Sequence, residues 1–433
     1  MNLIEKDNRY VWHPYTHQKN RLPAIPIIKG KKTILTDEDG KKYIDGISSW
    51  WVNIHGHGNK FIAKKLYQQA KKLQQVIFAG FTHQPAVELA EKLTKVLPGN
   101  FSKIFYSDNG STATEVSIKM ALQYWVNKDE PNRNKILAFH HSYHGDTFGA
   151  MSISERGTYT FAFRDKLFEV IFIDAPTPEN ILSNKEIIDQ HKNEIACIIY
   201  EPLLQGAGGM KMYDPGPLNN LLSLLKKEEI ICIADEVLTG FYRTGKFFAG
   251  DYLLEKADII CLSKALTGGS MALGVTACTQ KIYDAFVSDD KTKTLFHGHS
   301  FTANPLACTA SLASLCLLQK KNYKKKIDRI VSMQKIFSET LEKYKEKDIV
   351  KNIRHLGTII AFEVNTKESD GYLNNITNEF TKFCLAKGVY LRPMGNTIYV
   401  MPPYCIKKKE LEKIYEVIEK FLNENYSDVP LST

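Results

Sequence analysis

Residues 230–269 read IICIADEVLTGFYRTGKFFAGDYLLEKADIICLSKALTGG, and this stretch decides the fold. It holds two short apolar runs, and a chemically distinctive side chain follows each of them: Asp235 after the first run and Lys264 after the second. Continuous apolar runs of this length are typical of strands that are buried on both faces of a parallel sheet. The separation of 29 residues suits one strand–helix–strand unit. Ligands of open α/β sheets bind beyond the carboxyl ends of the strands, so both side chains are candidates for a site.

Outward from this stretch, short apolar runs alternate with amphipathic segments from about residue 50 to about residue 310. The segments TATEVSIKMALQYWVN and PLNNLLSLLKKE have the apolar spacing of helices. Alternation of strands and helices over this length predicts an α/β domain with a doubly wound, mostly parallel sheet. The strand candidates are KIFYS, KILAF, VIFI, ACIIYE, IICIAD, DIICL and GVTAC.

Both ends of the chain differ from this central part. The beginning is polar, is interrupted by prolines, and contains a hairpin-like piece, TILTDEDGKKYID, with Asp39 and Gly40 at its turn. Near the end we expect two lysine-rich helical segments, a strand at TIIAFEV, another helix, and strand-like VYLRP and TIYVMPP. We therefore expect a large α/β domain over residues 51–310 and a smaller α+β domain over residues 311–433, with residues 1–50 as the N-terminal part of the small domain.

The composition narrows the classes of protein. The chain has 433 residues, with 57 lysines and arginines against 48 aspartates and glutamates, and its apolar and charged fractions are near those of average soluble chains. This balance excludes a disordered, collagen-like or coiled-coil protein. No apolar run approaches the ~18 residues that a membrane helix needs, and the N-terminus has no apolar signal core. We therefore expect no membrane association and a cytoplasmic location.

Cysteines, lysines and histidines indicate neither a metal site nor a nucleic-acid partner. The eight cysteines form no CxxC pair, and several lie in apolar runs, as buried thiols do. The lysine clusters at residues 320–326 and 407–409 suit solvated helix faces. The histidines of HGHGN, HHSYHGD and HGHS lack the HExxH spacing and predict loops at a ligand pocket. Two alternatives from other classes of protein are a basic nucleic-acid-binding protein and a metal-dependent hydrolase. Only these features would support them.

The two strand-end residues leave two interpretations open. Asp235 and Lys264 form either a simple ion pair or a site for pyridoxal phosphate. In the second case Lys264 binds the cofactor aldehyde as a Schiff base, and Asp235 keeps the pyridine nitrogen protonated. The segment SDNGSTATE offers a seat for the phosphate, because Gly110 allows close approach and Ser111 lies at a helix N-terminus. An ordinary N-terminal helix cap is the alternative for these residues.

Aromatic and arginine residues in loops complete the candidate set. Trp51 in SSWWVNIHGHG and Tyr143 in HHSYHGD either anchor their loops in the core or line a pocket, where one ring suits stacking on a planar cofactor. Arg392 in VYLRPMGN is either exposed or clamps a substrate carboxylate through its forked guanidinium group.

Taken together, these segments resemble the class III, pyridoxal-phosphate-dependent aminotransferases of fold type I over about residues 10 to 425. The run IADEVLTGFYRTGKFFAGDY followed by DIICLSKALTGG carries this resemblance. The segments WHPYTH, DGISSWWVNIHGHGN, SYHGDTFGAMS, LLQGAGGMKMY, FHGHSFTANPLAC and YLRP with IYVMPPY are similar to the biotin-pathway branch of the class. The resemblance implies a large domain with a mostly parallel doubly wound sheet, a small α+β domain built from both termini, and a homodimer with active sites at the subunit interface.

For the site, the resemblance implies a role for each matching residue. Lys264 matches the lysine that binds the cofactor, Asp235 the partner of the ring nitrogen, and Tyr143 the residue that stacks on the ring and lines the substrate pocket. The other matches are Gly110 and Ser111 for the phosphate, Gly298, His299 and Ser300 in the segment that reaches the site from the neighbouring subunit, and Tyr15, Trp51, Arg392 and Tyr399 for the substrates. Arg243 in FYRTG also lies near the site in the family pattern. His299 stands where some members have proline, whereas Ser300 keeps a hydroxyl group.

The activity that the resemblance implies is amination of 8-amino-7-oxononanoate to 7,8-diaminononanoate in biotin biosynthesis, with pyridoxal phosphate as the cofactor. S-adenosylmethionine is the amino donor that this branch usually implies, and lysine is an alternative that the motifs do not separate from it. Another class III enzyme, such as an ω-amino-acid aminotransferase, shares the aspartate and the lysine but is not expected to carry the double tryptophan and the WHPYTH segment.

Overall fold

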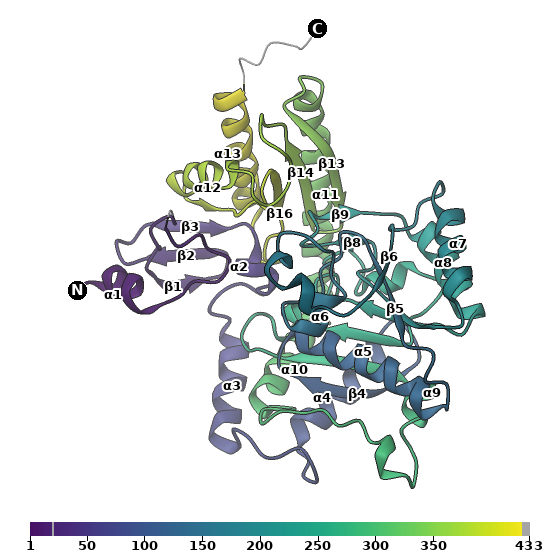
Figure 1. Cartoon of the computed structure of the whole chain (residues 1–433). Helices are drawn as coiled ribbons and strands as arrows, with labels where there is room; N and C mark the ends of the chain where they lie inside the picture. The colour runs from purple at the N-terminus through teal and green to yellow at the C-terminus, as the bar shows by residue number, and fades with distance from the viewer. Residues whose placement is uncertain (20, 427–433) are drawn as a thin grey trace.

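A seven-stranded sheet lies at the centre of the fold in the computed structural model, which describes residues 1–19 and 21–426 (Figure 1). Its order is β4-β12-β11-β10-β7-β5-β6, and only β12 runs antiparallel to its neighbours. Each of the seven apolar runs is one of these strands, so the prediction of a mostly parallel sheet is confirmed. The bounds are β4 (Phe101–Ser107), β5 (Lys135–Phe139), β6 (Ile171–Ile173), β7 (Ile195–Tyr200), β10 (Ile231–Asp235), β11 (Ile259–Leu262) and β12 (Gly274–Thr279).

Helices cover both faces of this sheet. Side chains alternate along a strand, so Ile198 of β7 packs into one hydrophobic cluster and Ile199 packs into a second one. Helix α5 (Gly110–Asn127) contributes to the cluster of Ile199, whereas α8 (Pro215–Lys227) contributes to the cluster of Ile198. The predicted doubly wound α/β fold is therefore confirmed.

A second sheet joins the two ends of the chain. Strands β1 (Ile27–Lys31), β2 (Ile34–Asp37) and β3 (Lys42–Asp45) pair antiparallel, and the β2–β3 hairpin turns at Gly40, whose φ angle is 80°. Strand β15 (Val389–Tyr390) then adds to β3 in parallel. This shared sheet supports a small domain built from both termini, while its boundaries stay a prediction.

The C-terminal part differs from its prediction in two respects. Two lysine-rich helices were expected before its sheet, but only α11 (Lys321–Lys345) is lysine-rich. The preceding α10 (Pro305–Leu318) is largely apolar and buried. Strand β13 (Val350–Leu356) was not predicted, since its charged sequence becomes a strand only by pairing with β14 (Ile359–Val364). Strand β16 (Thr397–Val400) completes this three-stranded sheet.

The remaining helices and a small hairpin complete the fold. None of the helices in the described residues is long and apolar enough to cross a membrane. The other helices are α1 (Leu3–Tyr10), α2 (Ser48–Trp51), α3 (Lys60–Lys72), α4 (Gln84–Val96), α6 (Phe148–Ser152), α7 (Ile181–His191), α9 (Gln280–Asp284), α12 (Ile376–Ala386) and α13 (Lys408–Tyr426). The 3-10 helices are η1 (Phe161–Lys166), η2 (Ala249–Tyr252), η3 (Lys264–Thr267) and η4 (Lys291–Lys293), and a small hairpin pairs β8 (Leu204–Gln205) with β9 (Lys211–Met212).

Candidate active site

The carboxylate of Asp235 lies at the carboxyl end of β10, at the edge where open α/β sheets bind ligands. Only 4% of the residue is exposed, and its Oδ2 atom lies 2.7 Å from Nδ1 of His144. The backbone N–H of Val237 donates to Oδ1 at 3.0 Å. The other ring nitrogen of His144, Nε2, is buried without a hydrogen-bond partner among the described residues. These contacts hold the acid in one orientation.

Lys264 follows the neighbouring strand β11 and begins the 3-10 helix η3. Because β10 and β11 are parallel and Asp235 is in register with Cys261, both functional candidates reach the same end of the sheet. They line one cavity of about 640 Å³, called the strand-end cavity from here on. The Nζ atom of Lys264 lies 4.7 Å from the centre of a Trp51 ring.

The interpretation of a simple ion pair fails. Among the described residues, no carboxylate oxygen lies within 4.0 Å of the Lys264 ammonium group, and Asp235 pairs with His144 instead. Burial lowers the pKa of Lys264, although the negative charges of Asp235 and Glu201 oppose this shift. Its φ angle of 43° is a left-handed conformation that costs a non-glycine residue roughly 1–3 kcal/mol. Because its pKa is lowered, the amine of Lys264 loses its proton more readily than that of an ordinary lysine.

Glu201 is a functional candidate that the sequence analysis missed. It follows β7 at the same edge of the sheet, is 5% exposed, and lines the strand-end cavity. The backbone N–H groups of Tyr143 and Gly206 donate to its two oxygens at 3.0 and 2.8 Å. Burial raises the pKa of Glu201 to about 7, while His144 opposes the rise and Asp235 adds to it. Its place at the end of ACIIYE, the same signal that selected Asp235, would have identified it.

The first turn of α5 forms another wall of the strand-end cavity. Asn109 caps the helix, and the N–H groups of Gly110 and Ser111 have no acceptor within the helix. A Cβ atom on Gly110 would lie 2.8 Å from Cγ1 of Val237, so a larger residue does not fit without a shift. The hydroxyl of Ser111 accepts from the N–H of Asp146 at 3.2 Å. A helix N-terminus of this kind favours an anion.

Lys264 also lines a second cavity of about 440 Å³, called the aromatic cavity. It shares Lys264, Trp51 and Tyr143 with the strand-end cavity. Five of the residues predicted for substrates or for the ring line it: Tyr15, Trp51, Tyr143, Arg392 and Tyr399. They come from both ends of the chain and from the loop after β5, so this wall exists only in the folded protein.

Hydrogen bonds fix the aromatic rings of this cavity. The Nε1 atom of Trp51 donates to the hydroxyl of Tyr399 at 2.9 Å. The hydroxyl of Tyr15 donates to Asp146 at 2.5 Å and lies 3.3 Å from the hydroxyl of Tyr143. Burial raises the pKa of Tyr15 and of Tyr143, and the hydrogen bond to Asp146 raises that of Tyr15 further. Both phenols therefore stay protonated near neutral pH.

Arg392 supplies a positive charge to the aromatic cavity. Its Nη2 atom donates to the carbonyl oxygen of Tyr15 at 3.1 Å, and its Cζ atom lies 5.0 Å from the centre of a Trp50 ring. In residues 1–19 and 21–426, no carboxylate oxygen lies within 4.0 Å of its guanidinium group. This leaves N–H donors for the carboxylate of a ligand.

The short element α2, which carries the two tryptophans, has a strained and partly non-helical backbone and is called the tryptophan loop below. Ser48, Ser49 and Trp51 have φ angles of 54°, 58° and 70°, which other residues than glycine rarely adopt. The buried carboxylate of Asp45 accepts from the N–H and from the hydroxyl of Ser49, both at 2.8 Å. Its Oδ2 atom also lies 2.9 Å from Nε2 of His57. Asp45 therefore holds the conformation that directs Trp51 toward Lys264.

The structure does not bring Gly298, His299 and Ser300 to either cavity of their own chain. They lie between η4 and α10, where the carbonyl oxygen of Ser300 accepts from Gln75 at 2.7 Å. The hydroxyl of Ser300 stays exposed to solvent. Their role in the site remains a prediction.

Arg243 lies behind the aromatic cavity and does not line it. The residue is fully buried, and its guanidinium group donates to the carbonyl oxygens of Trp51 and Pro402 at 3.0 and 3.1 Å. It supports the position of Trp51 and leaves ligand contacts to other residues.

Three histidines of the glycine-rich loops pair with acidic side chains. His57 contacts Asp45, His140 contacts Glu155 at 2.9 Å, and His144 contacts Asp235. In the described ranges no three His, Cys, Asp or Glu side chains lie close enough to hold a metal ion. The paired histidines therefore support the walls of the cavities.

A doubly wound sheet with a lysine and an acid at adjacent strand ends matches the pyridoxal-phosphate-dependent transferases of fold type I. The profile of the aminotransferase class-III family matches residues 15–422, and the chain belongs to this family. Among its relatives, the adenosylmethionine-8-amino-7-oxononanoate aminotransferase of Synechococcus elongatus is 43% identical over 96% of this chain and 99% of that protein. The protein of the same name in Staphylococcus aureus is 37% identical over 96% of each chain.

Solved structures show the same fold. The crystal structure of adenosylmethionine-8-amino-7-oxononanoate aminotransferase from Methanocaldococcus jannaschii has a TM-score of 0.90 at 35% identity, over 96% of this chain and 98% of that one. An ω-transaminase from Thermomicrobium roseum has a TM-score of 0.91 at 27% identity, over 98% of each chain. Because both TM-scores are high, the fold does not separate these two kinds of aminotransferase, and the sequence identity distinguishes them.

The strand-end cavity fits pyridoxal phosphate, the cofactor of this family. Lys264 offers an amine whose pKa is lowered, and Asp235 offers a buried carboxylate for the ring nitrogen. Gly110 begins the helix at which the phosphate can approach the backbone closely. Lys264, Asp235 and the N-terminal turn of α5 line one cavity. A planar ring that carries an aldehyde and a phosphate requires these three groups together.

Proposed function

We propose that this enzyme transfers an amino group from S-adenosylmethionine to 8-amino-7-oxononanoate and so makes 7,8-diaminononanoate for biotin biosynthesis. The relatives named for these two compounds support the choice of substrates. The observation that carries the proposal is the position of Lys264, which lies in the wall between the strand-end cavity and an aromatic cavity that contains Arg392. One amine thus borders both the proposed cofactor site and the proposed substrate site.

Pyridoxal phosphate, when bound, supplies an aldehyde that takes up the donor's amino group and a ring that stabilises negative charge at the reacting carbon. Lys264 would hold the cofactor through its aldehyde, and its lowered pKa favours the neutral, nucleophilic amine. With the cofactor bound, the free amine of Lys264 would be the group that takes a proton from the reacting carbon of the substrate and returns one. Asp235, held by His144, stabilises a proton on the ring nitrogen.

The aromatic cavity receives both substrates in turn. The rings of Tyr15, Trp51 and Tyr143 offer apolar surface to the chain of the keto acid. Arg392 binds the carboxylate of the keto acid with its remaining N–H donors. Tyr399 shapes the wall, because its hydroxyl group accepts from Trp51.

The proposal includes a homodimer in the cytoplasm. Since Gly298, His299 and Ser300 lie outside both cavities of their own chain, we assign them to the strand-end cavity of the partner subunit, with the Ser300 hydroxyl at the phosphate and Gly298 next to the substrate. All eight cysteines are free thiols, which is typical of the reducing cytosol.

The test is a pair of half-reactions with the purified holoenzyme. We expect S-adenosylmethionine alone to bleach the visible absorbance of the lysine-bound cofactor, and 8-amino-7-oxononanoate to restore it while mass spectrometry detects 7,8-diaminononanoate. L-Lysine serves as the second donor. Restoration by other keto acids but not by 8-amino-7-oxononanoate would refute the acceptor, and bleaching by lysine alone would refute the donor.

A further inference from the structure

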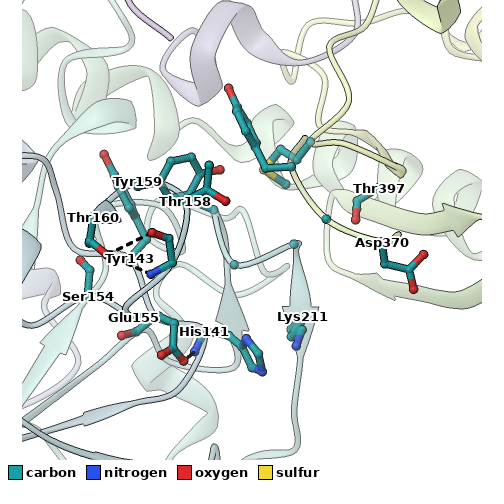
Figure 2. A pocket seen from close by; sticks show the side chains of 18 of the residues that line it. His141, Tyr143, Ser154, Glu155, Thr158, Tyr159, Thr160, Lys211, Asp370 and Thr397 are labelled. Carbon is teal, nitrogen blue, oxygen red and sulfur yellow. Dashed lines mark hydrogen bonds between the residues drawn. The ribbon is translucent and has the colours of Figure 1, made fainter. Parts of the chain in front are cut away.

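His55 belongs to the glycine-rich loop HGHGN, yet it faces none of the cavities near the candidate active site. Figure 2 shows His141 on the wall of a third cavity, of about 530 Å³, together with Tyr143 and Lys211. His55 lines neither this cavity nor the strand-end and aromatic cavities. The residue is 6% exposed and comes shortly after the tryptophan loop. Any effect of His55 on the site therefore passes through the residues that it contacts.

Both ring nitrogens of His55 have a partner from a distant segment. The Nε2 atom lies 2.9 Å from the hydroxyl of Ser314 on α10, and Nδ1 contacts the hydroxyl of Tyr323 on α11. The hydroxyl of Ser314 in turn donates to the carbonyl oxygen of Ala265 at 3.3 Å. Ala265 is the neighbour of Lys264 in the 3-10 helix η3. Hydrogen bonds thus connect α11 with the residue next to the reactive amine.

These hydrogen bonds have one consistent direction. A carbonyl oxygen only accepts, so the hydroxyl hydrogen of Ser314 points to its carbonyl partner. The Ser314 oxygen then accepts from Nε2–H of His55, and Nδ1 accepts from the hydroxyl of Tyr323. This assignment requires a neutral imidazole. Burial, together with the positive charges of Lys326 and Arg243, lowers the pKa of His55 to about 3, so the ring is neutral at physiological pH.

The segment around His55 also packs against the end of η3. Gly268 closes η3 with a φ angle of 65°, and a Cβ atom on it would lie 2.5 Å from Cδ2 of His55. A Cβ atom on Gly269 would lie 3.0 Å from Cα of Asn53. The segment after the tryptophan loop is therefore in direct contact with the two glycines that follow η3. A displacement of His55 reaches η3 through this packing as well as through Ser314.

Lys264 needs support from outside η3. Its φ angle of 43° lies in the left-handed region, and a 3-10 helix of four residues has few hydrogen bonds of its own. The carbonyl oxygen of Ala265 accepts from the N–H of Gly268 at 2.9 Å, and the hydroxyl of Ser314 is its second donor. Because Ser314 is fully buried on α10, this second bond fixes η3 to the interior of the protein.

We propose that His55 is a positioning residue for Lys264. His55, held by Tyr323, turns the hydroxyl of Ser314 toward the backbone of η3, and this bond keeps the amine aimed at the strand-end cavity. His55 also joins η3 to the tryptophan loop, which fixes Lys264 relative to Trp51. This inference rests on the proposed role of Lys264 as the amine that holds the cofactor.

Ser314→Ala tests the inference with the smallest change of shape. In the holoenzyme we expect kcat to fall about 10-fold, while the KM values of both proposed substrates change by less than about 2-fold, because the amine is displaced and the substrate wall is not. Ser311→Ala is the matched control. Ser311 is also fully buried on α10, but its hydroxyl has no hydrogen-bond partner among the described residues. This control should keep the kcat of the wild type.

Hydrogen–deuterium exchange gives a readout that does not depend on turnover. The N–H groups of Leu266 and Gly268 close η3 by donating to the carbonyl oxygens of Ser263 and Ala265. With and without bound cofactor, these two amides should exchange about 5-fold faster in Ser314→Ala than in the wild type, because η3 opens more often. In Ser311→Ala they should exchange as in the wild type.

Variants of His55 separate positioning from general packing. His55→Leu should lower kcat by as much as Ser314→Ala does, and the double variant should lose no more than His55→Leu alone, because both changes interrupt the same hydrogen bonds. His55→Gln keeps an N–H donor for Ser314 and should recover most of kcat. If His55→Leu does not fold, Tyr323→Phe takes its place, since it removes only the hydroxyl that holds Nδ1.

Unchanged kcat in Ser314→Ala, an equal loss in Ser311→Ala, or a loss confined to KM would each overturn the inference. Failure of the proposed function gives a different result. Retained turnover in Lys264→Ala would refute the role of this lysine, whereas an inactive Lys264→Ala together with a fully active Ser314→Ala would refute only the positioning by His55.

Discussion

The strand-end cavity and the aromatic cavity meet at Lys264 but are built by different means. The strand-end cavity takes its chemistry from buried groups at the ends of parallel strands: Asp235 ends β10, Glu201 follows β7, and Lys264 comes shortly after β11. The aromatic cavity takes its wall from a strained loop, the N-terminal segment and the C-terminal sheet. The sheet thus places the candidate reactive groups, and segments that are distant in sequence build the wall next to them.

The first prediction removes the residue that both cavities share. Lys264→Ala should lose at least about 10⁴-fold in turnover and all visible absorbance of the bound cofactor, because the nucleophile and the proton carrier disappear together. Steady-state kinetics and absorbance spectra measure both effects, and Lys382→Met is the control for loss of an ordinary lysine. Retained steady-state transamination in Lys264→Ala would refute the assignment.

The second prediction affects the aromatic cavity alone. Arg392→Ala should lower kcat/KM of the keto-acid half-reaction by about 100-fold, because the carboxylate loses a charged, forked donor, and should change the donor half-reaction much less. Stopped-flow absorbance follows each half-reaction separately. Arg392→Lys, which keeps a charge, should recover part of the loss. Equal losses in both half-reactions would count against the carboxylate clamp.

The third prediction acts on the loop behind the tryptophans. Asp45→Asn removes an acceptor from Ser49 and should raise the KM for the keto acid about 10-fold, since Trp51 loses its fixed position. The cofactor spectrum should not change. Asp37→Asn is the matched control, because Asp37 is also buried in the N-terminal sheet but bonds to Tyr43. A similar rise in KM in both variants would show that general destabilisation is the cause.

The fourth prediction concerns stability and pH. The pKa of Glu201 is about 7 in the folded state against an ordinary value of 4.5, so the folded protein binds more protons than the unfolded chain between these values. Below pH 4.5, Glu201 makes its full contribution to the free energy of unfolding. As the pH rises from 4.5 through 7, this contribution falls by about 3 kcal/mol. Glu201→Gln should flatten this fall.

Urea unfolding at pH 5 and at pH 8 measures the difference. The exposed Glu346→Gln is the control and should keep the pH dependence of the wild type. If Glu201→Gln lost as much stability between pH 5 and pH 8 as the wild type does, the raised pKa would be wrong.

Sequence patterns predicted those parts of the molecule that depend on local order. The seven strands, the hairpin at Gly40 and the strand-end position of Asp235 and Lys264 follow from apolar runs and their breaks, which short segments contain by themselves. Strand β13 did not follow, because its charged sequence depends on a partner strand.

Contacts between distant segments could not be predicted in the same way. The bond between Trp51 and Tyr399 joins residues 348 positions apart, and the support of Trp51 by Arg243 spans 192 positions. The family resemblance named the tryptophan and the tyrosine but did not supply their pairing. Glu201 was missed although its signal was present, and Gly298 to Ser300 line neither cavity of their own chain, so their role stays a prediction.

The parallel pairing of β15 with β3 determines when the parts of the site can form during synthesis of the chain. The strand-end cavity takes all its residues from the chain up to Leu273. The aromatic cavity needs Tyr390, Arg392 and Tyr399, and the N-terminal hairpin receives its last strand only from Val389 and Tyr390. On the ribosome, the newly made chain therefore contains all of its own residues of the strand-end cavity more than a hundred residues before the wall of the aromatic cavity can form.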